Sequence, residues 1–173
     1  TVLPAVLGVR DLLATFPRLE AGLDRMPRLL PGWRRGVGAA ALATGCLGLV
    51  GLGLLPDILF PMLWLAPLLI LVGTEELAGE RSLLTLLMEG DWKPIWRAAL
   101  AALVCGFFWE FWNWGSLARW DYSIPYVDRF HLFAMPVLGY AGYLPFGLEC
   151  VAAAAFVLRR DRLRLLTGPG TRS

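Results

Sequence analysis

The sequence predicts an all-α protein, a polytopic bundle of transmembrane helices with four complete spans and a partial one at the N-terminus. Of its 173 residues, 57% are hydrophobic and only 17% are charged, whereas about a quarter of a soluble domain is charged. The apolar residues form runs of about 20, long enough to cross a hydrocarbon core of roughly 30 Å. The charged residues collect between these runs, so residues 1–173 are expected to form a single membrane domain.

The N-terminal part begins with an apolar stretch, residues 1–9, which we interpret as the end of a span. No basic region precedes an apolar core as in a signal peptide, so we expect a chain truncated at its N-terminus. Residues 10–35 carry six arginines and three prolines. This composition predicts an interfacial linker on the cytoplasmic membrane surface.

Two apolar runs follow and predict a helical hairpin. Residues 36–55 are uninterrupted and rich in glycine and alanine, which lets neighbouring helices approach closely. A two-residue turn forces residues 58–78 to run back antiparallel, and Pro61 is expected to bend this span. Glu75 and Glu76, near its far end, are expected to be solvated.

The second half of the chain predicts two more spans, residues 95–115 and 136–158. An interfacial helix in residues 79–93 precedes them, and a loop rich in aromatic and charged residues, 116–135, joins them. Residues 159–173 are expected to form a cytoplasmic tail.

The distribution of basic residues predicts the orientation. Fourteen of the 16 lysines and arginines fall on one side, and only Arg119 and Arg129 fall on the other. Because cytoplasmic loops are enriched in basic residues, we expect a bacterial inner-membrane protein with a cytoplasmic C-terminus. Besides the lipid bilayer, its expected partners are missing N-terminal spans or a neighbouring subunit. The net charge of +2 without a basic stripe excludes a nucleic-acid partner.

We expect neither a metal nor a cofactor. The three cysteines lie inside apolar segments without a CxxC spacing, and His131 is the only histidine. No catalytic triad, phosphate-binding loop or nicotinamide-binding motif is present in a usable context.

Two acids inside the apolar runs are the candidate catalytic residues, because a charge in a bilayer is costly. Glu110 and Asn113 lie three residues apart on one helix face, which Gly106 narrows for packing against another helix. The pair is either a proton donor with its polar neighbour or a hydrogen-bonded link between helices. Glu149 follows Pro145, which is expected to kink the span or break it into two half-helices, with Glu149 in the first turn of the second half. It is either a protonated acid or a structural contact, and the sequence leaves open whether it meets Glu110.

The aromatic residues near Glu110 allow two interpretations. Their position fits the aromatic belt of a membrane interface, or the walls of a site for a flat or polyene ligand. The candidate substrate-binding residues are Asn113 and the aromatic side chains of Trp109, Trp112, Trp120 and Tyr143.

Three stretches carry a family resemblance: FFWEFWN at residues 107–113, WDYSIP at 120–125 and MPVLGYAGYLPFGLE at 135–149. They resemble a family of uncharacterised bacterial multi-pass membrane proteins. The resemblance implies further spans before Thr1 and no assigned reaction.

A more distant similarity is to integral-membrane lycopene cyclase domains, in which a Trp-x-aromatic element precedes a span with Pro-x-Glu-Glu. Trp120-Asp121-Tyr122 and Pro145 to Glu149 have a similar order, and the resemblance implies that Glu149 is the acid. The spacing from proline to glutamate is longer here, and Cys150 stands in place of the second glutamate. Those cyclases protonate a polyene and steer the carbocation.

Three functions are therefore expected from the sequence. The first is a membrane protein that binds or acts on an apolar lipid, with isoprenoid or carotenoid chemistry at Glu149 and Glu110. The alternative is a non-catalytic accessory or scaffold subunit of a membrane complex. The third is half of a transporter, in which residues 58–78 form a second broken span.

Overall fold

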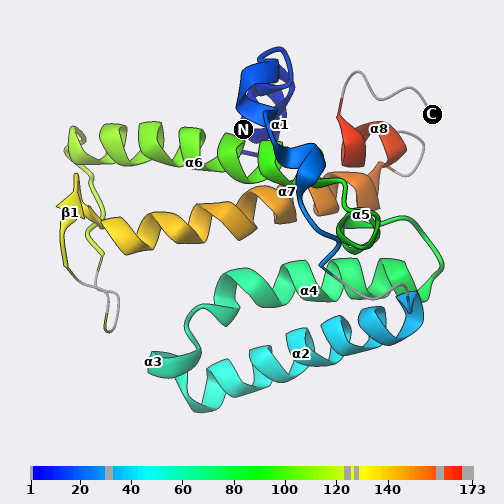
Figure 1. Cartoon of the computed structure of the whole chain (residues 1–173). Coiled ribbons are helices and arrows are strands. Elements are labelled where there is room, and N and C mark those ends of the chain that lie inside the picture. The colour runs from blue at the N-terminus through cyan, green and yellow to red at the C-terminus, as the bar shows by residue number, and fades with distance from the viewer. Residues whose placement is uncertain (1, 30–32, 123–125, 127–128, 159–161, 169–173) are drawn as a thin grey trace.

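The structure, a computed structural model, describes residues 2–29, 33–122, 126, 129–158 and 162–168. Within these residues, three helical segments are long and apolar enough to cross a membrane: Arg34–Leu54, Trp92–Trp114 and Val137–Val157. The helices run side by side and nearly all the regular structure is helical (Figure 1). These features support the predicted class, a helical membrane protein.

One layer of the bundle is the predicted hairpin, formed by α2 (Arg34–Leu54) and α4 (Met62–Leu77). Glycines allow the contact, because an ideal Cβ on Gly45 would lie only 2.9 Å from the carbonyl oxygen of Ala66. The span expected over residues 58–78 is divided into α3 (Pro56–Leu59) and α4, with Pro61 as the N-cap of α4. At 16 residues, α4 is shorter than the three long segments.

The second layer consists of α6 (Trp92–Trp114) and α7 (Tyr143–Val157), with α7 between α6 and α4 (Figure 1). Backbones meet at Gly147, where an ideal Cβ would lie 2.1 Å from the carbonyl oxygen of Ala98. The N-terminal helix α1 (Val2–Leu13) packs against α6 and α7. Its helix therefore continues beyond the predicted span end at residue 9.

The irregularity in the last span lies earlier than expected. A 3₁₀ helix, η3 (Val137–Gly142), leads directly into α7. Pro145 is the third residue of α7, two residues after the junction with η3. The break predicted around Pro145 therefore falls at the η3 to α7 junction, and Glu149 lies in the second turn of α7 and not in the first.

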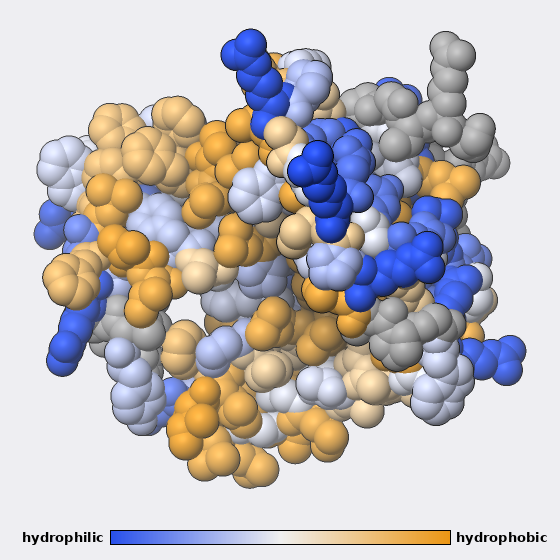
Figure 2. Space-filling model, in the orientation of Figure 1, coloured by the Kyte–Doolittle hydropathy of each residue, from blue (hydrophilic) through white to orange (hydrophobic). Residues whose placement is uncertain are grey.

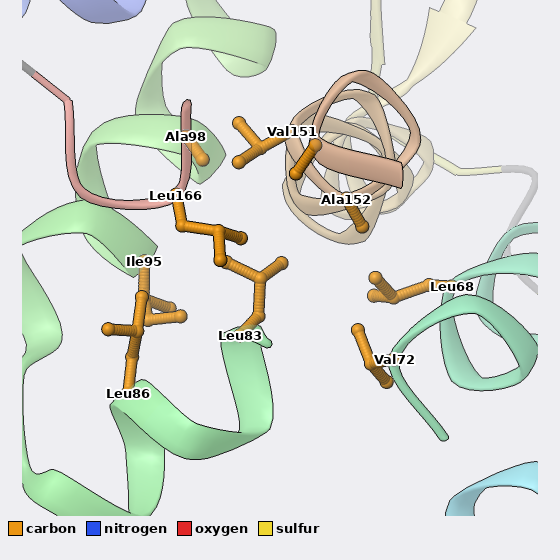
Figure 3. Packing of buried hydrophobic residues seen from close by; sticks show 10 residues of the cluster. Leu68, Val72, Leu83, Leu86, Ile95, Ala98, Val151, Ala152 and Leu166 are labelled. Atoms are coloured by element: carbon orange, nitrogen blue, oxygen red, sulfur yellow. The ribbon is translucent and has the colours of Figure 1, made fainter. Parts of the chain in front are cut away.

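The main core joins five helices, including two short ones, α5 (Leu83–Glu89) and α8 (Arg162–Thr167). Leu83 and Leu86 of α5 meet Leu166 of α8 and Val151 of α7 in this cluster (Figure 3). The predicted tail therefore contributes to the core through α8. Residues 159–161 and 169–173 of that tail lie outside the described residues.

The two ends of the bundle differ in chemistry. The basic end carries α5, α8 and the short 3₁₀ helices η1 (Pro17–Glu20) and η2 (Leu23–Arg25). The aromatic end carries the C-terminal turns of α6 and a hairpin of β1 (His131–Leu132) and β2 (Met135–Pro136). Hydrophilic side chains gather mainly over the basic end, and hydrophobic ones cover α2, α3 and much of the aromatic end (Figure 2).

Candidate functional site at the aromatic end

Glu110 lies at the centre of a hydrogen-bonded cluster inside the aromatic end. Its side chain is fully buried, with 0% exposure. The hydroxyl groups of Tyr122 and Tyr143 each donate a hydrogen bond to Oε1, at 2.6 Å. The indole N–H of Trp120 donates to the Tyr122 hydroxyl, also at 2.6 Å. The second oxygen, Oε2, is buried and has no hydrogen-bond partner among the described residues.

Gly106 makes room for this cluster one helical turn before Glu110. An ideal Cβ on Gly106 would lie 2.5 Å from the ring of Tyr143. Without a side chain at this position, Tyr143 of α7 lies directly on α6 and its hydroxyl reaches the carboxyl group. The predicted packing of this helix face is therefore confirmed, since Gly106, Glu110 and Asn113 are all buried.

Asn113 holds the loop that follows α6. Its Nδ2 donates to the backbone carbonyl of Trp120 at 2.8 Å, and its Oδ1 accepts from the Trp120 backbone N–H at 2.9 Å. These paired bonds fix the chain two residues before Tyr122. Asn113 is therefore a positioning residue, because it sets where the Tyr122 hydroxyl meets Glu110.

The surroundings of Tyr122 keep its hydroxyl group protonated, so that it donates a hydrogen bond to Glu110. Burial, reinforced by the hydrogen bond to Glu110, raises the pKa of Tyr122 to about 12. No lysine, arginine or histidine among the described residues forms an ion pair with Glu110. The carboxyl group is therefore surrounded by neutral hydroxyl groups and aromatic rings.

A continuous series of ring contacts leads from Glu110 to α4. The ring of Trp109 lies 6.1 Å from that of Tyr143 and 6.4 Å from that of Phe146, and Phe146 meets Trp64 edge to face at 6.1 Å. Trp64 lies in the first turn of α4, beside Gly142 at the start of α7. Figure 2 shows an opening at this end of the molecule, where the α6 and α7 layer separates from α3 and the start of α4. The rings thus form a series from the buried acid to the start of α4, the helix that lies beside the opening.

Two predicted site residues lie away from the cluster. Trp112 is 62% exposed, and among the described residues its ring contacts one other ring, that of Phe108, in a tilted arrangement at 6.1 Å, as expected for an aromatic belt. Glu149 is half-buried, with no hydrogen bond or ion pair to the described residues. It lies six residues beyond Tyr143, or about 9 Å along the axis of α7. The structure therefore brings Glu110, Asn113, Trp109, Trp120 and Tyr143 together but does not add Glu149 to them.

Sequence reasoning missed the role of Tyr122 as a partner of Glu110. The available signal was its position beside Trp120 in the Trp120-Asp121-Tyr122 element. Reasoning from helix faces alone could not find it, because Tyr122 lies in a loop beyond the end of α6.

The expectation that Glu75 and Glu76 are solvated is wrong, since they are 2% and 1% exposed. Glu76 accepts a hydrogen bond from Ser82 Oγ at 2.6 Å and pairs with Arg34, with 2.7 Å between Nε and Oε2. Arg162 pairs with Glu75, with 2.7 Å between Nη2 and Oε1. Each of these acids therefore has a cationic partner.

Comparison of the chain with protein families, with curated proteins and with solved structures finds no match. The family resemblances therefore stay predictions from the sequence. Among the described residues, no group of three or more metal-ligating side chains is placed to hold a metal ion.

Proposed function

We propose that the protein is an integral membrane protein that binds an apolar lipid of isoprenoid type and acts on it with the carboxyl group of Glu110. The observation that carries this proposal is the state of Glu110, which is fully buried and, among the described residues, is bonded only to tyrosine hydroxyls, with Oε2 left without a partner. A buried polar atom without a partner costs about 1–3 kcal/mol. Such a cost is common where a ligand or a reacting group meets the protein.

The surroundings of Glu110 suit a hydrocarbon substrate. An acid that adds a proton to a carbon–carbon double bond breaks the π bond and creates a carbocation, which forms a new double bond when a neighbouring carbon returns a proton to the carboxylate. Aromatic faces stabilise the cation between these two steps. The rings of Trp109, Tyr143 and Phe146 supply such faces beside the acid. Glu149 is the second candidate acid, farther along α7.

The opening at the aromatic end gives the lipid a lateral route. Both irregular segments, the α3 to α4 break and the η3 to α7 junction, lie at this end. A transporter is expected to break its helices near the bilayer midplane, so these positions favour a lipid opening over an ion-coupling site. In this proposal α3 and α4 together form the fourth span, and the basic end faces the cytoplasm across a bacterial inner membrane.

The non-catalytic alternative is favoured by the paired bonds between Asn113 and Trp120. These bonds attach a loop to a helix, which is a structural role. In that case Glu110 stabilises the loop through Tyr122, and the chain joins a larger membrane complex without changing a lipid.

The binding proposal is tested by extracting the lipids that co-purify with the protein from host membranes and measuring them by mass spectrometry. Trp109→Leu removes the ring that contacts both Tyr143 and Phe146, and is expected to lower the retained apolar lipid about three- to tenfold. Trp112→Leu is the matched control, because Trp112 lies on the same helix with its ring exposed. Equal lipid retention in both variants would contradict the proposal.

A further inference from the structure

A second polar site lies at the opposite end of the molecule, in a surface pocket at the basic end. The pocket has a volume of about 250 Å³ and is lined by Arg28, Arg34, Thr85, Met88 and Glu89. It lies where the chain before α2, the first turn of α2 and helix α5 meet. None of its residues belongs to the Glu110 cluster.

The pocket carries a positive charge that the protein does not neutralise. Arg34 uses Nε for Glu76, and Nη2 for the Glu80 carbonyl and the Thr85 hydroxyl, which leaves both N–H groups of Nη1 available. Arg28 has no ion pair among the described residues. The one acid of the pocket, Glu89, already pairs with Arg81.

Hydrogen bonds close to Arg28, the arginine without an ion pair among the described residues, hold its backbone in position. The Leu29 N–H donates to the Leu87 carbonyl at 3.3 Å, and the indole N–H of Trp92 donates to the Pro27 carbonyl at 2.9 Å. Gly90 has φ +80°, and an ideal Cβ there would lie 3.3 Å from Cγ of Arg28. The turn after α5 thus leaves room for the aliphatic part of the Arg28 side chain, and the chain continues past this side chain.

The level of the pocket in the membrane indicates which kind of ligand its positive charge binds. Arg34 is the first residue of α2, one of the helices long and apolar enough to cross a membrane. The start of such a helix lies at the level of the lipid headgroups. Basic pockets at this level between membrane helices are suited to lipid phosphate groups, and arginine binds phosphate with several parallel hydrogen bonds.

We propose that this pocket binds the phosphate group of an anionic glycerophospholipid. Arg28 and the Nη1 group of Arg34 donate to the phosphate oxygens, and the Thr85 hydroxyl lies beside them. Met88 gives the pocket an apolar wall for the glycerol and the first acyl carbons. The site is independent of the lipid substrate proposed at Glu110.

The proposal is tested with the purified full chain in nanodiscs of phosphatidylcholine that contain a minority of phosphatidylglycerol. Phosphatidylglycerol retained by the protein is measured by native mass spectrometry. Arg28→Gln is expected to weaken retention about fivefold with little loss of thermal stability, because Arg28 has no ion pair among the described residues and glutamine keeps the part of the side chain that packs near Gly90. Arg25→Gln, which removes an exposed arginine of η2 outside the pocket, is the matched control and is expected to have little effect.

Two further arms separate the possible sources of the effect. Glu89→Gln removes the one acid of the pocket and is expected to increase retention of phosphatidylglycerol. Inorganic phosphate added to the nanodiscs is expected not to displace the lipid. An equal loss in Arg25→Gln would show a general surface charge and overturn the site, and displacement by inorganic phosphate would overturn the lipid assignment.

Discussion

Both ends of the molecule bury carboxyl groups, but they surround them with different partners. At the basic end Glu20 pairs with Arg97, Glu75 with Arg162 and Glu76 with Arg34. At the aromatic end the partners of Glu110 within the described part of the chain are the hydroxyls of two tyrosines.

The difference shows what each kind of acid can do. An ion pair joins segments that are distant in the sequence, as Arg97 of α6 holds η1 through Glu20. In the pair of Glu20 with Arg97, removing the carboxylate charge would leave the guanidinium buried and unpaired, which is costly. Glu110 has no cationic partner among the described residues, and its Oε2, like both oxygens of Glu75, has no hydrogen-bond partner there. This contrast supports the proposal that the acids of the basic end are structural and that Glu110 is the reactive group.

The largest effect is expected from breaking an ion pair at the basic end. Glu20→Gln leaves the Arg97 guanidinium buried without its carboxylate, where both side chains are only 10% exposed. The free energy of unfolding in detergent is expected to fall by about 3 kcal/mol.

The neighbouring ion pair of Lys93 and Asp24 provides the control. It is more exposed, at 35% and 74%, so Asp24→Asn is expected to change stability by less than about 1 kcal/mol. Similar losses in both variants would show that burial does not distinguish these pairs.

The second largest effect is expected from filling the space between α6 and the ring of Tyr143. Gly106→Ala places a methyl group where it would overlap the ring, and overpacking of this kind costs about 1–3 kcal/mol. The ring must move, so the hydrogen bond from Tyr143 to Glu110 is expected to weaken. Thermal unfolding measures the cost. Gly53→Ala is the control because an ideal Cβ there meets nothing within 4 Å, and an equal loss in that variant would refute the close contact.

The smallest effect is expected from Tyr122→Phe, which removes a hydrogen bond worth about 1 kcal/mol. It also changes the response to alkaline pH. The pKa of Tyr122 is raised to about 12 in the folded protein from about 10 in the unfolded chain. Its contribution is complete below about pH 10 and is lost as the pH rises through about 12. Wild-type stability should fall more steeply over this range than that of Tyr122→Phe, and parallel curves would contradict the assignment.

The sequence predicts the long helices well because hydropathy is a local property. The apolar runs at residues 36–55 and 95–115 correspond closely to α2 and α6. The exact effect of proline is less predictable from sequence. Pro61 divides its span as N-cap of α4, whereas the last span changes from η3 to α7 two residues before Pro145. Which outcome applies depends on where the helix begins.

The polar contacts are harder to predict, because their partners come from distant segments. Glu76 is contacted by Arg34 of α2 and Thr85 of α5. No pattern in the sequence around Glu76 indicates these contacts. At the site, the sequence correctly predicts a close helix contact at Gly106, and it places Glu110 and Asn113 on one helix face. Tyr122 was not found as a partner, since it reaches Glu110 from a loop that Asn113 holds.

The central claim, that Glu110 supplies the reactive group, is tested most directly by the lipid products of host membranes. Extracts from cells with the wild-type chain are compared by mass spectrometry with Glu110→Gln and Glu149→Gln at matched abundance. We expect a new lipid product in the wild type, its loss in Glu110→Gln, and its persistence in Glu149→Gln. An identical set of lipids from wild type and Glu110→Gln would contradict the claim and favour the scaffold alternative.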